Sequence, residues 1–151
     1  MKVSAGSAED LGLFLHHLGT HLREIEASVT IDLYADFEIE EPDAKKEFEE
    51  FRARIVRASE YQPQRGFWSR FARKPERFMG VPLDLTTDEG IRTFSLLAPR
   101  VIGCEGYRNE KVIFSTIENE NIVRLDIPEQ EVSRIVAQAH LSGAVSVIAT
   151  D

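Results

Sequence analysis

The feature that most constrains the fold is an unbroken alternation of apolar and polar residues from Val29 to Ile39. Successive side chains of a β-strand point to opposite faces, so this pattern predicts one long strand with a buried side and a solvent-facing side. The solvent-facing side would carry Asp32, Asp36 and Glu38 in a row. We interpret this row either as an ordinary solvated sheet face or as an acidic surface for a cation or a basic partner.

Four other stretches have helical periodicity. The first begins at Ser7, which has the character of an N-cap, and its apolar stripe runs from Leu11 to Ile25. Gly12 and Gly19 lie seven residues apart on one side of this helix, where close packing of another element would offset their cost. Further helices are expected over 42–59, 86–99 and 128–143. In the helix expected over 86–99, Thr86 and Glu89 have capping-box spacing.

Short apolar runs predict the remaining strands, over 101–104, 111–117, 122–127 and 144–149, with the middle two joined as a hairpin. The expected class is therefore α+β: a single domain over residues 1–151, with helices packed on a largely antiparallel sheet of about four to five strands. A mixed sheet is the alternative, if the last strand returns parallel after a short crossover helix.

A basic aromatic segment, residues 61–85, interrupts this order. The whole chain carries −8 at pH 7, yet residues 61–78 carry +4. Such a long connector is usually functional or disordered. We interpret it as a loop or lid whose aromatic residues either enter the core or anchor a partner. The candidate binding residues are Tyr61, Arg65, Phe67, Trp68, Arg70, Phe71, Arg73, Lys74 and Arg77.

The chain carries no standard catalytic, cofactor or nucleotide-binding motif. His17, His21 and Glu24 form the best metal candidate, but they flank the apolar stripe of the first helix, and we expect no metal or cofactor there. The single cysteine, Cys104, would need a base such as His140 to act as a nucleophile, and a small buried thiol is the expected state.

We therefore expect a small acidic, non-catalytic module that binds another protein, plausibly a basic one, as a stoichiometric inhibitor of immunity or antitoxin type does. The competing hypotheses are an enzyme or small-ligand-binding domain with its pocket beneath residues 61–85, and a nucleic-acid binder using the same segment. The acidic remainder of the chain disfavours nucleic acid. No run is apolar enough for a membrane span, and a lone cysteine fits the cytoplasm. Nothing in the sequence indicates an oligomeric state.

Overall fold

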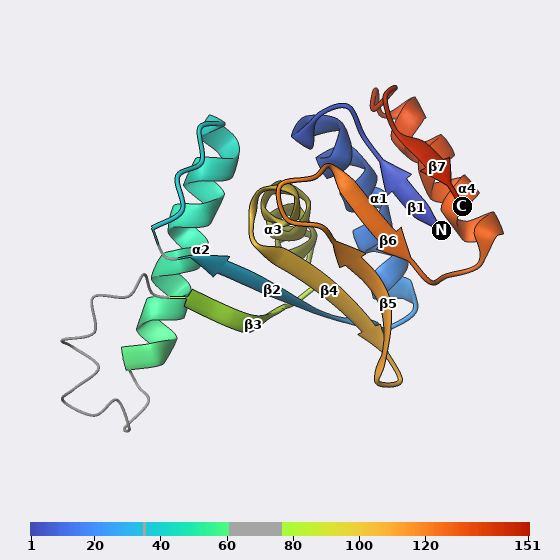
Figure 1. Cartoon of the computed structure of the whole chain (residues 1–151). Helices are drawn as coiled ribbons and strands as arrows, with labels where there is room; N and C mark the ends of the chain where they lie inside the picture. The colour runs from blue at the N-terminus through green and yellow to red at the C-terminus, as the bar shows by residue number, and fades with distance from the viewer. Residues whose placement is uncertain (35, 61–76) are drawn as a thin grey trace.

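The computed structural model describes residues 1–34, 36–60 and 77–151. Within these ranges, four helices lie on one side of a single seven-stranded sheet, with α2 reaching it beside α3, and none of them covers the other face (Figure 1). The strands are β1 (Lys2–Ser4), β2 (Ser28–Tyr34), β3 (Arg77–Leu83), β4 (Gly103–Arg108), β5 (Lys111–Thr116), β6 (Ile122–Leu125) and β7 (Ile148–Thr150). The helices are α1 (Ala8–Glu24), α2 (Pro42–Glu60), α3 (Asp88–Leu97) and α4 (Glu129–Leu141), with a 3₁₀ turn, η2, at Ala98–Arg100. The α+β class is confirmed.

The strand order is β3-β2-β4-β5-β6-β1-β7, and every neighbouring pair runs antiparallel. The mixed-sheet alternative is therefore wrong for the described strands, since β7 pairs antiparallel with β1. The strand count exceeds the four to five expected. The predicted hairpin is present, with β5 and β6 joined through a turn in which Asn119 has a φ of 58°.

Helix α1 is central to the helical layer, since it contacts α3 and α4. The side chain of Ser7 accepts a hydrogen bond from the Asp10 N–H at 3.1 Å, which confirms the expected N-cap. The predicted stripe is fully buried at Leu11, Phe14, Leu15, Leu18 and Leu22. None of the helices in the described part of the chain is both long and apolar enough to cross a bilayer.

The two glycines of α1 mark the site where α3 packs against it. A Cβ at Gly12 would lie 2.9 Å from the Ser95 carbonyl oxygen, and a Cβ at Gly19 would lie 3.1 Å from a ring carbon of Phe94. The close packing predicted from the spacing of the two glycines is therefore present. Only glycine lets the backbones of α1 and α3 approach this closely.

Strand β2 is shorter than the alternation predicts. Ile31 and Leu33 are fully buried as expected, but the ladder with β3 ends at the Tyr34–Arg77 pair. Asp36 lies in a turn and Glu38 in the segment beyond it, so the three carboxylates do not form one row on a strand. Ile39 is still buried, at 8% exposure, because an extended segment keeps its two-residue alternation even without a strand partner.

Two strands were missed by sequence analysis, and one was misplaced. Strand β1 has three residues, too few to show a period. Strand β3 was missed because its Gly80 and Pro82 indicate a loop. The strand lies at an edge of the sheet, where proline is tolerated. Gly80 has a φ of 63° where the register between β2 and β3 shifts. Strand β7 was expected to be buried over 144–149, but it occupies the other edge, and Ile148 is 58% exposed.

The helix termini differ from the predictions in one place. Helix α3 is capped by Thr87 rather than Thr86, with the Thr87 hydroxyl accepting from the Gly90 N–H at 3.0 Å. Thr86 does not cap the helix, and its N–H instead donates a hydrogen bond to the Asp84 carboxylate at 2.9 Å. At the end of α4, Gly143 has a φ of 101°, as expected for the residue just past a helix.

Candidate functional site

An acidic cavity of about 340 Å³ opens where α1 begins, beside the segment between β2 and α2. It is bordered by the first residues of α1, by residues 37–41, by η2 and by the β5–β6 turn. The lining residues are Ala8, Glu9, Phe37, Glu38, Ile39, Glu40, Glu41, Pro99, Arg100, Val101 and Asn119. The wall thus combines apolar side chains with four carboxylates and one guanidinium, a composition suited to a side chain with an apolar stem and a cationic head.

The local backbone directs two of these carboxylates outward. Ile39 is anchored in the core, so its neighbours Glu38 and Glu40 are both exposed. Phe37 is half-buried, and its ring stacks on Tyr34 with centroids 6.5 Å apart and an interplanar angle of 7°. The alternation first seen in the sequence therefore positions the site, even though the segment is not a strand.

The other charged groups of the acidic cavity already have partners. Arg100, whose side chain is 12% exposed, lies 3.5 Å from Glu9 and donates to the Leu96 carbonyl at 2.9 Å. Glu41 accepts from the N–H groups of Ala44 at 2.6 Å and Asp43 at 3.2 Å, which caps α2. The hydrogen bond from Ala44 is the main reason that the pKa of Glu41 is lowered. Among the described residues, Glu38 and Glu40 have no ion pair or hydrogen bond and remain available to a ligand.

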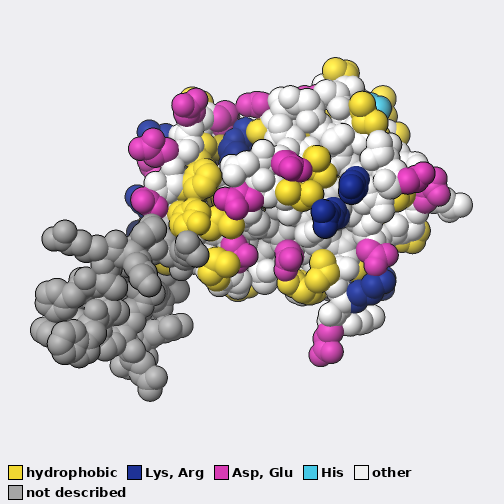
Figure 2. All heavy atoms as spheres, viewed as in Figure 1, with side chains coloured by type: hydrophobic (Ala, Val, Ile, Leu, Met, Phe, Trp, Pro, Cys, Tyr) yellow, Lys and Arg dark blue, Asp and Glu magenta, His cyan; other side chains and the backbone are white. Residues whose placement is uncertain are grey.

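Charge is concentrated around this cavity. Residues 36–50 alone carry −6, while the described residues together carry −11, because 61–76 contribute +3 to the total of −8. Figure 2 shows acidic side chains gathered at the upper left, over α2 and the segment that precedes it. A second cavity of about 340 Å³, lined in part by Phe37, Glu38, Glu40 and Phe48, lies against the same segment. This end of the molecule therefore presents grooves and negative charge together.

The candidate nucleophile, Cys104, is buried. Cys104 is 1% exposed in β4, and burial raises the pKa of its thiol well above the usual value, with the Asp32 and Glu105 carboxylates adding to the effect. The ring of His140 hydrogen-bonds the Val147 carbonyl, with its Nε2 atom 2.7 Å from that oxygen. The burial expected for this thiol is confirmed, and the raised pKa disfavours the thiolate, which is the reactive form of cysteine.

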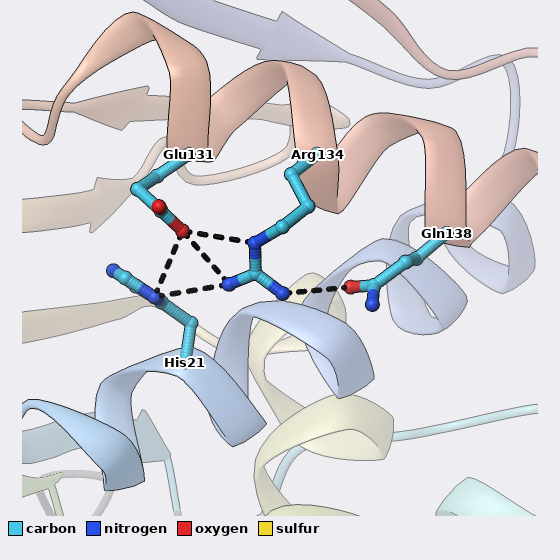
Figure 3. A network of polar contacts seen from close by, with 4 residues as sticks. All are labelled: His21, Glu131, Arg134 and Gln138. Atoms are coloured by element: carbon cyan, nitrogen blue, oxygen red, sulfur yellow. Dashed lines mark hydrogen bonds and ion pairs between the residues drawn. The ribbon is translucent and has the colours of Figure 1, made fainter.

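The histidines of α1 serve helix packing. His17 Nε2 lies 2.7 Å from the Ser142 hydroxyl, beyond the end of α4. His21 is 7% exposed and points toward α4, where its Nδ1 lies 3.5 Å from Glu131 and 3.4 Å from Arg134 (Figure 3). Within the described ranges, no three histidine, cysteine, aspartate or glutamate side chains are placed to hold a metal ion.

The predicted basic aromatic site falls almost entirely outside the described residues. This applies to Tyr61, Arg65, Phe67, Trp68, Arg70, Phe71, Arg73 and Lys74, while the backbone of Arg77 belongs to β3. A cavity of about 340 Å³ does adjoin the end of that segment, against Pro82 and Leu83. The polar residues that line this cavity already have partners. Arg54 pairs with Glu89 at 3.0 Å, and the Thr93 hydroxyl donates to the buried Glu47 at 2.5 Å.

Of the acidic residues singled out in the sequence, the structure places Glu38 at the acidic cavity, Asp36 in the turn before it, and Asp32 on the open sheet face. The Asp32 carboxylate accepts from the Gly80 N–H at 2.5 Å. Sequence reasoning missed Glu9 and Arg100, which lie about 90 residues apart and carry no local signal. No protein-family model, curated protein or solved structure matches the chain, so the residues themselves carry its functional interpretation.

Proposed function

We propose that this chain is a non-catalytic module that binds a basic protein through its acidic cavity and the surrounding residues 36–50. The observation that carries the proposal is the pair of exposed carboxylates, Glu38 and Glu40, which have no partner among the described residues and are held beside an apolar-walled cavity by the buried Ile39. An arginine or lysine of the partner would place its stem against Phe37 and Pro99 and its cationic head between the carboxylates.

The charge distribution supports the same partner chemistry. A net charge of −6 within fifteen residues attracts a cationic surface at long range and accelerates encounter. Stoichiometric inhibition of a basic protein, as immunity and antitoxin proteins perform it, is the specific role we favour. The buried thiol of Cys104 and the structural partners of His17 and His21 are consistent with a role that needs no reactive group.

The test is affinity purification from the source cell with two matched double variants. Glu38→Gln/Glu40→Gln removes the two free carboxylates. Glu24→Gln/Glu26→Gln makes the same charge change at the other end of α1, about 25 Å along the helix from the cavity. We expect a basic protein in near one-to-one yield with the parent and with the control pair, and about tenfold slower association with the cavity variant.

Three results would contradict the proposal: an acidic partner, equal association rates for both double variants, or rates that do not fall as salt is added. Salt screens exposed charges over about 10 Å at 0.1 M, so a complex formed by charge attraction must show that dependence.

A further inference from the structure

A cavity of about 500 Å³ lies on the open face of the sheet, and the charged side chains at its wall include two cations, unlike the acidic cavity. It is lined by residues of β1, β5 and β6 together with Asp126 and Asp151, and it shares no lining residue with the acidic cavity. Its volume falls within the range of small-molecule sites.

Two cations stand opposite each other at this cavity. Lys2 of β1 is paired in register with Arg124 of β6, and their neighbours Val3 and Val123 are fully buried in the core. Side chains alternate along a strand, so Lys2 and Arg124 both project from the open face, with Cβ atoms about 5 Å apart. Figure 2 looks onto this face and shows basic side chains near its middle.

This arrangement costs stability. Like charges directly opposite each other on neighbouring strands destabilise a sheet. Within the described part of the chain, neither Lys2 nor Arg124 makes a salt bridge, although the chain holds 26 acidic residues. The nearby Asp126 is already paired with Lys111 at 2.6 Å, and Asp151 is exposed at the cavity rim.

The remaining wall fits an organic anion. Ser115, the register partner of Arg124 on β5, offers a small hydroxyl donor beside the guanidinium. Val112, farther along β5 and 42% exposed, supplies an apolar surface. We propose that the cavity binds a small organic oxyanion, with a phosphate or carboxylate head between Lys2 and Arg124 and an apolar body against Val112. The anion relieves the repulsion between the two cations, which no salt bridge offsets within the described part of the chain.

The experiment titrates the ¹⁵N-labelled full chain with phenyl phosphate, benzoate and the neutral benzyl alcohol at constant ionic strength. Saturable shifts of the Lys2, Ser115 and Arg124 amides with an anion, but not with the alcohol, are expected. The preferred anion identifies the head group. Arg124→Gln should weaken binding about tenfold, and Arg57→Gln, which removes an exposed cation on α2, should leave it unchanged.

Arg124→Glu separates binding from folding. It replaces a repulsive pair with an attractive one, so the melting temperature should rise by about 1–3 °C while anion binding is lost. Three results would overturn the proposal: no saturable shift with either anion, equal binding by Arg124→Gln and the parent, or a lower melting temperature for Arg124→Glu in the absence of ligand.

Discussion

Replacing Gly12 by alanine sets two effects of known sign against each other. Alanine is favoured over glycine within a helix by about 1 kcal/mol, so local propensity alone predicts a more stable protein. The new Cβ, however, would lie 2.9 Å from the Ser95 carbonyl oxygen, against an ordinary carbon–oxygen contact of about 3.3–3.6 Å.

The steric effect should win. The Ser95 carbonyl oxygen belongs to the backbone and cannot swing aside, so relief requires α1 and α3 to separate by about 0.4 Å or more. That shift loosens packing around Phe14 and Phe94, both fully buried. Overpacking a core costs about 1–3 kcal/mol, so after the propensity gain we expect a net loss of about 1–2 kcal/mol.

Thermal unfolding followed by circular dichroism measures this loss as a fall in melting temperature of about 3–6 °C for a chain of this size. Gly19→Ala should be milder, because its close neighbours are side-chain atoms of Phe94 and Ile91, which can adjust. His16→Ala, at an exposed position of α1, controls for propensity. A Gly12→Ala protein that melts at or above the parent temperature would refute the close approach of α1 and α3.

Further predictions follow from burial and titration. Leu33→Asp should lower the free energy of unfolding by about 3–5 kcal/mol because it buries a charge, whereas Asp32→Leu loses one exposed hydrogen bond and should cost about 1 kcal/mol, measured by denaturant midpoints. Partial burial, and then the charge of a neighbouring histidine, lower the pKa of His17 in the folded protein, so His17 binds its proton more readily in the unfolded chain. The stability should therefore fall as the pH drops below about 6.5, the pKa of a free histidine. The melting temperature of His17→Gln should fall less than that of the parent between about pH 7.5 and about pH 5.5, and an equal fall would exclude His17 as the cause. Cys104 should resist thiol reagents until the protein is denatured, and rapid modification of the native chain would show that β4 opens.

The extent to which the sequence predicts the fold depends on how local the signal is. The stripe from Leu11 to Leu22 and the alternation from Val29 to Leu33 extend over several periods, and the structure buries these residues as expected. Strands β1 and β3 depend on partners far along the chain. Three residues cannot show a period, and Pro82 indicates a loop unless its strand is known to lie at an edge.

The same distinction applies to the candidate site. Glu38 was identified because it belongs to the alternating segment, but its expected neighbours on a strand face were wrong, because the β2 ladder ends at Tyr34. Arg100 reaches the acidic cavity only through the packing of η2 against α1, where it meets Glu9. Sequence separation hides such pairs, since their partners are determined by tertiary contacts.

The interior position of β1 has a consequence for how the protein is made. Residues 2–4 pair on one side with 122–124 and on the other with 148–150, so β1 waits for two strands that are synthesised much later. Until residues 148–150 have left the ribosome, the edge of β1 that pairs with β7 stays unpaired, even where β1 has already met β6. Such long-range pairing slows folding, because loop closure must precede the contacts that reward it. We therefore expect the nascent chain to acquire its β2–β4–β5–β6 ladder first and to close the β6–β1–β7 half only after residues 148–150 have emerged.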